Sequence, residues 1–170
     1  RGILIRKGEA IQTLKEVKTI VFDKTGTITS GKPKVTDVYS KIGERKLLEI
    51  AASLEKLSEH PLAHAIVQKA NLKKYKKVEG FKIIRGRGVE GKIGNKKIVI
   101  GNRALMKDKK ISIESINDSI MKMESEGKSV MIVSMQNKVQ GAIGVADTIK
   151  EDSKRAIEEL HNMGYKTVML

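Results

Sequence analysis

The chain has 170 residues, 39% of them hydrophobic and 32% charged, a balance typical of a folded globular protein and not of a disordered one. It has no cysteine, which excludes disulfides and thiolate metal sites, and no apolar run of the roughly 20 residues needed to span a bilayer. Its net charge of +14 suits a polyanionic partner such as a nucleic acid or a nucleotide, but a solvated lysine-rich surface gives the same charge.

The first predicted element is a short apolar run at residues 19–22, read as a buried strand of parallel type that ends at Asp23. A polar loop follows, and residues 31–33 (Gly-Lys-Pro) are expected to break the chain. Apolar residues at helical spacing predict a helix over residues 43–57. Pro61, suited to a first helical position, predicts a second helix that continues to about residue 70.

The later elements follow from glycine punctuation and apolar periodicity. They are an antiparallel meander of strands at 81–84, 89–93 and 97–100, a helix over 115–126, a hairpin of strands 130–135 and 139–145, a helix over 148–163 ended by Gly164, and a strand over 166–170. The helical side chains expected to face the core are Leu47, Leu48, Ala51, Leu54, Ile116, Ile120, Met123, Ile149, Ala156, Ile157 and Leu160.

The order of the elements predicts one domain inserted into another. A strand, a long mixed segment, a helix and a strand form a βαβ-like unit of a doubly wound α/β sheet, interrupted by a second, α+β domain. We expect the first domain at residues 1–32 and 142–170, and the second at 33–141. The chain starts at Arg1 and stops within an apolar run at Leu170, so we expect a piece of a longer protein.

Asp23 is the strongest candidate for chemistry, because ligands of open α/β sheets bind at the carboxyl ends of strands. A carboxylate there can attack phosphorus and form an acyl phosphate if Mg²⁺ offsets the repulsion between the two anions. Thr25 can give that ion a backbone carbonyl, while Gly26 and Thr27 offer donors to the phosphoryl oxygens. Lys24 completes the motif. An Asp that only caps a turn is the alternative.

The string from Asp23 to Thr29 (Asp-Lys-Thr-Gly-Thr-Ile-Thr) resembles the phosphorylation motif of P-type ATPases without a departure. The resemblance implies an incomplete, haloacid-dehalogenase-like doubly wound phosphorylation domain, with an inserted nucleotide-binding domain made of an antiparallel sheet and flanking helices. It also implies an aspartyl phosphate at Asp23, ATP and Mg²⁺ as cofactors, and Asp23 and Thr25 as metal ligands. The implied location is the cytoplasmic face of a membrane, with residues 1–5 emerging from it.

A second motif, Ser-Glu-His-Pro-Leu-Ala at residues 58–63, is similar to the signature of the heavy-metal-transporting branch of that superfamily. This resemblance implies that His60 helps to hold the adenine ring of ATP and that Glu55 contacts the adenine amino group. A neutral imidazole can stack on a purine without desolvating a full charge. Two other interpretations stay open: His60 caps the helix that follows, or His60 and His64 form a metal pair at i, i+4 spacing.

The third motif, Gly-Arg-Gly-Val-Glu-Gly at residues 86–91, has the GxGxxG pattern but does not precede a helix, so it is not a dinucleotide fingerprint. Between two predicted strands, its glycines form a turn whose bare backbone admits a nucleotide, although a plain hairpin turn fits equally well. The nucleotide contacts that the resemblance implies here and in the next motif, Gly-Asn-Arg at 101–103, are Gly86, Gly88, Val89, Gly101 and Asn102.

The last motif, Asp-Thr-Ile-Lys at residues 147–150, is similar to the hinge motif of the family and implies Asp147 and Lys150 as hinge residues. An ordinary helix N-cap is an alternative role for Asp147. The motifs of the family that complete turnover lie beyond residue 170. We therefore expect a monomeric fragment that binds ATP and no nucleic acid, and that does not turn ATP over by itself.

The implied whole protein is a transporter of a heavy-metal ion, which would pass through a membrane domain absent from this chain. Glu59 before His60 favours copper or silver over zinc or cadmium by resemblance. A phosphatase of the same α/β superfamily is a rival enzyme class, but it would have a second Asp where Thr25 stands. A basic nucleic-acid-binding module is the non-enzymatic alternative, and it predicts salt-dependent binding to oligonucleotides.

Overall fold

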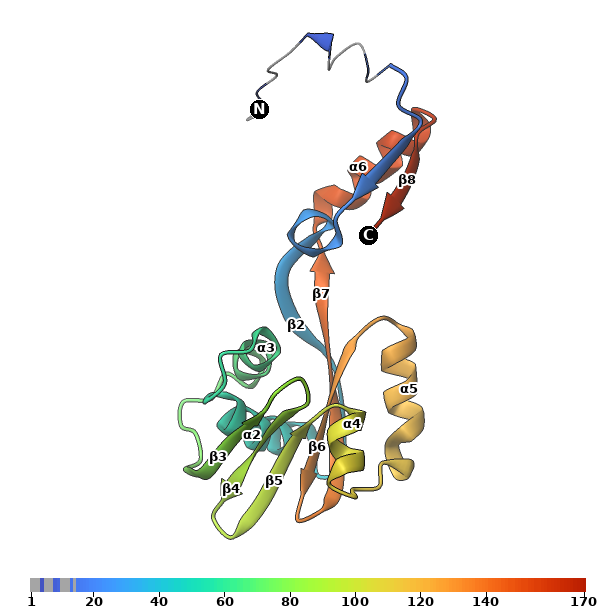
Figure 1. The fold of residues 1–170 in the computed structure, drawn as a ribbon. Coiled ribbons are helices and arrows are strands. Elements are labelled where there is room, and N and C mark those ends of the chain that lie inside the picture. Colours follow the sequence, from blue (N-terminus) through green and yellow to red (C-terminus); the bar gives the residue numbers. More distant parts are fainter. Residues whose placement is uncertain (1–3, 5–7, 10–12, 14) are drawn as a thin grey trace. The chain divides into compact units, whose positions relative to one another are not determined.

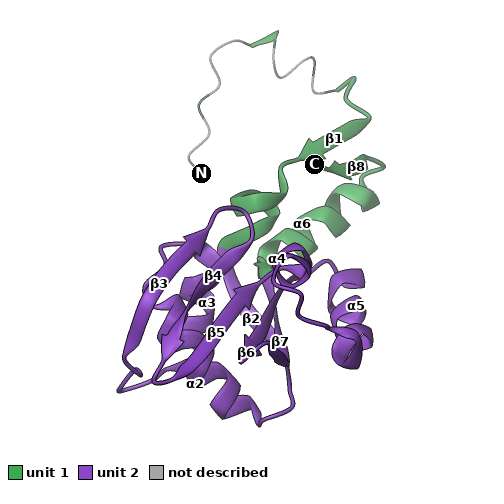
Figure 2. Ribbon diagram, turned by 60° about the horizontal axis from the view of Figure 1, so that its bottom comes forward, with its two compact units in different colours: residues 1–31, 147–170 green, residues 32–146 purple. Residues whose placement is uncertain are grey.

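A computed structural model describes residues 4, 8–9, 13 and 15–170. Residues 1–3 and 5 of the stretch expected next to a membrane lie outside the described residues. The chain divides into two compact units: residues 1–31 with 147–170 form unit 1, and residues 32–146 form unit 2 (Figure 2). These limits lie near the boundaries that the sequence predicts at 32/33 and 141/142. No helix of the described part is long and apolar enough to cross a membrane.

Unit 1 is built on a parallel two-stranded sheet of β1 (Thr19–Phe22) and β8 (Lys166–Met169), with helix α6 (Glu151–Asn162) leading into β8 (Figure 1). The parallel pairing of β1 confirms the prediction. The predicted burial of β1 is wrong. Val21 is 53% exposed, and no residue of α6 is buried. Two strands and one helix offer too little surface to cover both faces of the sheet.

The start of α6 corrects a second prediction. The helix expected from residue 148 begins at Glu151, because the chain up to Ile149 is still extended in strand β7. Ile149 and Ala156, both expected to face inward, are exposed. Ile157 and Leu160 are half-buried.

The end of α6 is as predicted. Gly164 lies just beyond the helix with φ +86, a left-handed conformation that glycine adopts without strain. The Gly164 N–H donates to the carbonyl of His161 at 2.9 Å, and the Tyr165 N–H donates to that of Leu160 at 3.0 Å. The glycine therefore closes the helix and turns the chain into β8.

Unit 2 is built on a six-stranded sheet in the order β2-β7-β6-β5-β4-β3. The pairs from β3 to β7 are antiparallel and confirm the predicted meander and hairpin. The strands are β2 (Thr29–Ser40), β3 (Val78–Ile84), β4 (Gly88–Ile93), β5 (Lys96–Gly101), β6 (Ser129–Met135) and β7 (Lys138–Ile149). The outer ends of β2 and β7 continue into unit 1.

Strand β2 corrects the expectation of a chain break at residues 31–33. The strand runs through Gly31 and Pro33 because β2 is the edge of the sheet. A proline has no N–H to donate to a neighbouring strand, which a central strand does not tolerate but an edge strand does.

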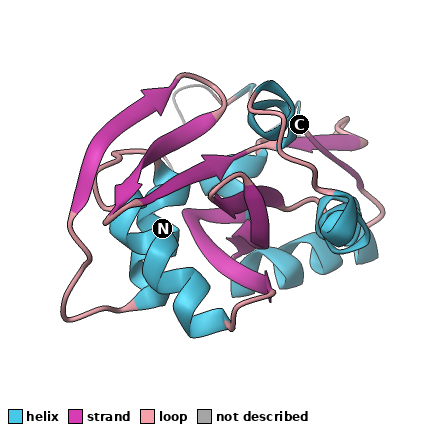
Figure 3. Ribbon diagram, turned by 90° about the horizontal axis from the view of Figure 1, so that it is seen from below, coloured by secondary structure: helices cyan, strands magenta, loops and turns pink. Residues whose placement is uncertain are grey.

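Helices cover both faces of this sheet (Figure 3). α2 (Glu44–Glu55) and α3 (Pro61–Ala70) match the two helices predicted there. On the other face lie α4 (Arg103–Asp108), which was not predicted, and α5 (Asn117–Ser125), preceded by one 3₁₀ turn at Glu114–Ile116.

Successive side chains of a strand point to opposite faces of the sheet, and the residues on the two faces form two separate hydrophobic clusters. In β5, Ile98 and Ile100 pack in the cluster with α2 and α3, whereas Val99 packs with α4 and α5. The side chains expected inward on α2 are confirmed in the first cluster, and Ile116, Ile120 and Met123 are confirmed in the second. Each face of the sheet thus has its own core, and the walls of the pocket described below rest on these cores.

Candidate functional site

Asp23 lies at the carboxyl end of β1, next to the end of β8. The Leu170 N–H donates to the carbonyl of Phe22 at 2.9 Å, and the Lys24 N–H donates to the carbonyl of Leu170 at 3.0 Å. The parallel pairing thus holds the backbone on both sides of Asp23, whose side chain is exposed. The structure presents this carboxylate to solvent at the rim of the sheet, as the sequence predicts.

The segment after Asp23, residues 24–28, is one wide turn that we call the Asp23 loop. Gly26 has φ +79 within it, which a side chain at this position would strain. The Gly26 N–H donates to the hydroxyl of Thr29 at 3.3 Å, and Thr29 is almost fully buried. Thr25, Gly26 and Thr27 are exposed, so the loop turns its residues outward over a fixed base.

Asp147 holds the outgoing end of this loop. Its carboxylate accepts hydrogen bonds from the hydroxyl of Thr29, from the hydroxyl of Ser30 at 3.1 Å and from the N–H of Gly31 at 3.2 Å. The alternative role as a helix cap is wrong, since the residue before α6 is Lys150 and Asp147 belongs to β7.

Lys150 holds the same loop from its apex. Its Nζ donates to the carbonyl of Gly26 at 2.6 Å, and its backbone N–H donates to the carbonyl of Ile28 at 3.0 Å. Lys150 therefore binds the Asp23 loop itself, and Asp147 binds the residues that directly follow it, all within unit 1. No sequence pattern predicted Thr29 and Ser30 as the partners of Asp147.

Unit 2 contains a pocket of about 580 Å³ between the end of α2, the start of α3, the β3–β4 turn, the start of α4 and the segment from α5 into β6. This volume lies within the range of small-molecule sites. Of the predicted nucleotide residues, Glu55, His60, Gly86, Gly88, Val89 and Asn102 line it. Gly101 does not.

Glu55 is the last residue of α2 and reaches the pocket from the core. It is 2% exposed, and its Oε1 has no hydrogen-bond partner among the described residues. Burial raises the pKa of this carboxyl to about 7, because low-polarity surroundings disfavour the charged form. A buried, unsatisfied carboxyl in a pocket wall indicates that a ligand supplies its partner.

His60 caps helix α3, so this interpretation is confirmed. Its Nδ1 accepts the N–H of Leu62 at 3.2 Å, with Pro61 at the first helical position. A neutral ring that accepts at Nδ1 carries its proton on Nε2, which leaves a donor for a ligand in the pocket. His64 is exposed and does not line the pocket. In the described ranges no group of three His, Asp or Glu residues could hold a metal ion.

The glycines of these motifs are needed for different structural reasons. A Cβ on Gly88 would overlap the carbonyl of Ile100, and a Cβ on Gly101 would overlap that of Arg87. These two glycines face each other in the β4–β5 ladder, where they let the strands and the β3–β4 turn approach closely. Gly86 has φ +68 with open space around its Cβ position, so only there does the bare backbone border free volume in the pocket.

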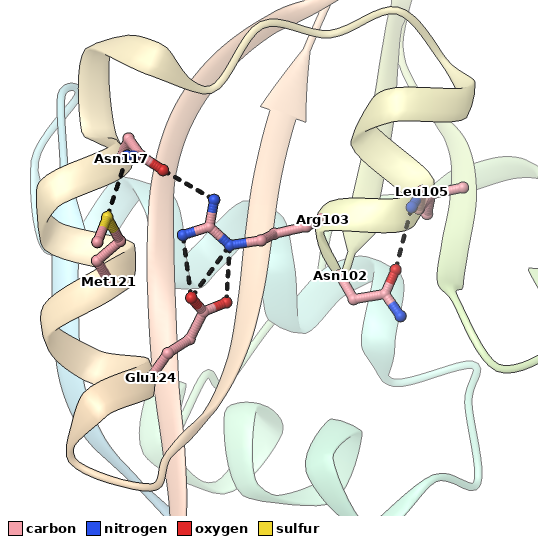
Figure 4. Close-up of polar contacts among 6 residues, drawn as sticks. All are labelled: Asn102, Arg103, Leu105, Asn117, Met121 and Glu124. Carbon is pink, nitrogen blue, oxygen red and sulfur yellow. Dashed lines mark hydrogen bonds and ion pairs between the residues drawn. The ribbon is translucent and has the colours of Figure 1, made fainter.

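Asn102 ties the β3–β4 turn to α4. Its Oδ1 accepts the N–H of Leu105 at 3.0 Å, which caps α4 (Figure 4). Its Nδ2 donates to the carbonyl of Gly86 at 3.0 Å. Asn102 therefore positions the pocket wall through its own hydrogen bonds. The expected direct nucleotide contact stays a prediction.

Arg103 links α4 to α5. Its guanidinium donates to both carboxylate oxygens of Glu124 at 2.9–3.1 Å and to Asn117 at 2.8 Å (Figure 4). Both Arg103 and Glu124 line the pocket. This bidentate pair fixes the two helices against each other at one side of the pocket.

The lining of the pocket combines apolar and charged side chains. Leu62, Ala63, Ile83 and Val89 lie with Glu55 among its lining, a composition suited to a flat heterocycle. The lining has three cationic side chains, Arg87, Arg103 and Lys128, and two acidic ones, Glu55 and Glu124. The pocket therefore fits a planar base that carries an anionic chain.

Several pocket residues were missed by sequence reasoning. Ile83 is 60% exposed although it is a large apolar residue in a strand, and Lys128 comes from a turn far from the other motifs in the chain. Arg87 and Leu62 lie inside the motifs at residues 86–91 and 58–63, so their place next to predicted site residues could have identified them. For Ile83 and Lys128 the sequence offered none.

The comparisons with known proteins cover nearly the whole chain. The family model described as "haloacid dehalogenase-like hydrolase" matches residues 17–170. A curated relative from Staphylococcus aureus (strain JH9), named copper-exporting P-type ATPase, is 43% identical over 99% of this chain and 21% of its own length. The chain thus spans about a fifth of the length of the curated relatives it matches.

Two solved structures resemble it. A zinc-transporting PIB-type ATPase is 35% identical with a TM-score of 0.85, covering 99% of this chain and 28% of that one. The N-domain of HMA8, a copper-transporting P-type ATPase, is 30% identical with a TM-score of 0.56, covering 66% of this chain and 99% of that one. With its Asp23 loop and inserted antiparallel domain, the chain belongs to the haloacid dehalogenase-like hydrolases and, within them, to the P-type ATPases.

Proposed function

We propose that this chain is the ATP-binding and phosphorylation part of a heavy-metal-transporting P-type ATPase. The observation that carries the proposal is the unsatisfied carboxyl of Glu55, buried beside His60 in the wall of a nucleotide-sized pocket. The same chain presents Asp23 at the rim of a parallel sheet. One unit thus has a site for a purine, and the other has a nucleophile for a phosphoryl group.

In this proposal the adenine ring packs against the apolar side chains of Leu62 and Ile83 and meets Glu55 and His60 at its polar edge. The phosphates extend toward the cationic side chains of Arg87 and Lys128. Arg87 also pairs with Asp108, which holds its guanidinium at the end of α4. Cations along the wall favour the bound triphosphate electrostatically.

The reaction is a transfer of the γ-phosphoryl group. A carboxylate oxygen of Asp23 attacks the γ-phosphorus, the bond from that phosphorus to the β–γ bridging oxygen breaks, and ADP leaves with the electron pair. Asp147 and Lys150 keep the Asp23 loop in shape while this happens, through Thr29 and Gly26. In this proposal the hydroxyl of Thr27 donates to a phosphoryl oxygen, and the N–H of Gly26 would have to leave its bond to Thr29 to do the same.

The oxygen donors at this rim fit a hard cation. The carboxylate of Asp23 and the carbonyl of Thr25 would hold Mg²⁺, since this ion prefers oxygen ligands and keeps several waters or phosphate oxygens. When bound, it offsets the repulsion between the attacking carboxylate and the phosphate.

Copper is the ion we propose for the whole protein, because the curated relatives at 40–43% identity are named copper-exporting. Zinc is the second candidate, since the PIB-type ATPase with a TM-score of 0.85 is zinc-transporting. The ion would pass through a membrane domain outside this chain. The chain itself would be a loop at the cytoplasmic face of the membrane.

Nucleotide binding is tested by titrating the chain with ATP and following heat or backbone amide shifts. His60→Asn keeps an oxygen that can cap α3 but removes the imidazole, and we expect ATP affinity to fall about tenfold, the loss of one good contact. His64→Ala is the matched control, because His64 is exposed outside the pocket, and it should bind like the wild type. Equal affinity in all three proteins would contradict the proposed role of His60.

Phosphorylation is tested in the full-length parent with γ-labelled ATP, Mg²⁺ and either Cu⁺ or Zn²⁺. We expect metal-dependent, acid-stable label in the wild type and none in Asp23→Asn. Label that persists in Asp23→Asn would disprove the nucleophile. Stimulation by Zn²⁺ but not by Cu⁺ would move the proposal to the zinc-transporting members.

A further inference from the structure

Glu55 lacks the partners that normally keep a buried carboxylate charged. Its side chain is 2% exposed, and within the described part of the chain it forms no ion pair and its Oε1 accepts no hydrogen bond. It is also the last residue of α2, where the backbone carbonyls leave a partial negative charge. Burial and position both disfavour the anion.

The charged groups around Glu55 do not reverse this preference. The titratable side chains that line the same pocket are His60, Arg87, Arg103, Glu124 and Lys128. Arg87 is paired with Asp108, Arg103 with Glu124, and Lys128 with Asp37 and Glu126. Burial accounts for the raised pKa of Glu55.

The other elements packed against α2 also offer no cation to this carboxyl. On α3, His64 and Lys69 are exposed. On β4, Val89 packs toward α2, so the alternation of the strand places Glu90 and Lys92 on the opposite face of the sheet. Lys82 of β3 pairs in register with Glu90 and shares that opposite face.

The protonation state decides which ring edge this carboxyl can bind. A neutral carboxylic acid has one O–H donor and one carbonyl acceptor, whereas a carboxylate only accepts. Adenine offers an acceptor at ring nitrogen N1 and a donor at its amino group, side by side. Guanine offers two adjacent donors, N1–H and its amino group. The acid therefore matches the adenine edge with two bonds, while the carboxylate matches that pair of guanine donors.

We propose that Glu55 binds the adenine ring of ATP as a neutral carboxylic acid, donating its O–H to N1 and accepting from the amino group, so that ATP binding above neutral pH takes up a proton. This inference rests on the proposed function of the pocket. It assigns Glu55 a second hydrogen bond and links the selectivity of the site to pH. The proton comes from solvent and returns to solvent when the nucleotide leaves.

The test is a Glu55→Gln variant of this chain, because glutamine keeps one donor and one acceptor but does not titrate. Glu59→Gln is the matched control, since Glu59 is exposed and does not line the pocket. ATP affinity is measured from pH 6 to pH 8.5 for all three proteins. Taking the ratio of wild type to Glu55→Gln at each pH cancels the titration of the ATP phosphates and every other effect that the two proteins share.

We expect wild type and Glu55→Gln to bind ATP within about threefold of each other at pH 6. Above pH 7 the wild type should weaken relative to the variant, approaching about tenfold per pH unit, because binding then requires protonation. Calorimetry at pH 8 in two buffers of different ionisation enthalpy should show about one more proton taken up by the wild type than by Glu55→Gln. The Glu59→Gln control should follow the wild type.

A second ligand sharpens the result. The preference for ATP over GTP should fall with rising pH in the wild type and stay constant in Glu55→Gln. A constant ratio of wild-type to variant affinity across the pH range, with equal proton uptake, would overturn the inference while leaving ATP binding intact. If neither protein binds ATP although both remain folded by circular dichroism, the proposed function of the pocket itself fails.

Discussion

The two units of the chain hold their functional residues by different means. In unit 2 the pocket walls rest on two hydrophobic clusters, and Glu55 and Val89 are themselves buried. In unit 1 no residue of α6 is buried; the Asp23 loop accepts a hydrogen bond from Lys150, and Thr29, just after the loop, donates one to Asp147. The candidate pocket is shaped by packing, and the Asp23 loop by polar contacts.

The difference teaches where each kind of function can be placed. A ligand pocket gains from a rigid wall, because shape selects the ligand before any contact is made. A nucleophile has to be exposed to its substrate, so it cannot be fixed by burial. Pairing with Leu170 holds the backbone on both sides of Asp23, and Lys150 and Asp147 hold the chain that follows it, at Gly26 and Gly31.

The largest expected effect breaks the packing of unit 2. Gly101→Ala places a Cβ against the backbone carbonyl of Arg87 and the side chain of Leu105, so we expect about 3–5 kcal/mol of destabilisation. Thermal and urea unfolding would measure it. Gly94→Asn is the control, since nothing lies near that Cβ and asparagine tolerates φ +57. Similar stability of the two variants would show that the β4–β5 contact is not tight.

A smaller effect concerns the pH dependence of unit 2. The pKa of Glu55 rises from 4.5 to about 7 on folding, so the folded state binds its proton more tightly than the unfolded state. At higher pH the folded state is therefore destabilised relative to the unfolded state. This destabilisation is absent below pH 4.5, grows between pH 4.5 and 7, and reaches about 3 kcal/mol above that range. We expect Glu55→Gln to be more stable than the wild type at pH 8 and nearly equal at pH 4.5, by urea unfolding. A difference independent of pH would contradict the buried, uncompensated carboxyl.

The polar contacts of unit 1 are the third target. Asp147→Ala removes an acceptor shared by Thr29, Ser30 and Gly31, and we expect about 2 kcal/mol of lost loop positioning, or about thirtyfold less phosphorylation in the full-length parent. ATP affinity of the pocket should not change. Asp152→Ala, which removes the same charge from the exposed first turn of α6, is the control. Equal loss in both variants would point to charge and not to the loop.

The smallest effect tests the polar link inside unit 2. Arg103→Lys replaces a bidentate pair to Glu124 by a single contact, and we expect about 0.5–1 kcal/mol of destabilisation because both side chains are more than a third exposed. High salt should shrink the difference. An effect several times larger would mean that α4 and α5 depend on this pair more than on their apolar cluster.

Most of the fold of unit 2 could be predicted, because its signals are local. Glycines bracket the strands of the meander, Pro61 marks the start of α3, and the apolar period of α2 names its buried face. α4 was missed since six residues are too few to show a helical period. β2 was missed because Pro33 signals a break unless the strand is known to be at an edge.

The candidate site was predictable only in part. Motif residues such as Asp23, Glu55 and His60 are short-range patterns, and the structure places the latter two in one pocket. Ile83 and Lys128 have no motif, and their presence there depends on which elements pack together. The partners of Asp147 lie more than a hundred residues earlier in the chain, so no local pattern predicts these contacts.

The sequence by itself indicated the proposed reaction class, because the candidate nucleophile Asp23 and its loop are consecutive residues. It also predicted most of the elements, since propensity and periodicity act over a few turns, but not α4 or β2. Only the tertiary structure decided that Glu55 is buried without a partner, that Gly88 and Gly101 serve strand packing, and that Lys150 binds the carbonyl of Gly26. These outcomes depend on contacts between distant segments, whose burial and distances no short stretch of sequence specifies.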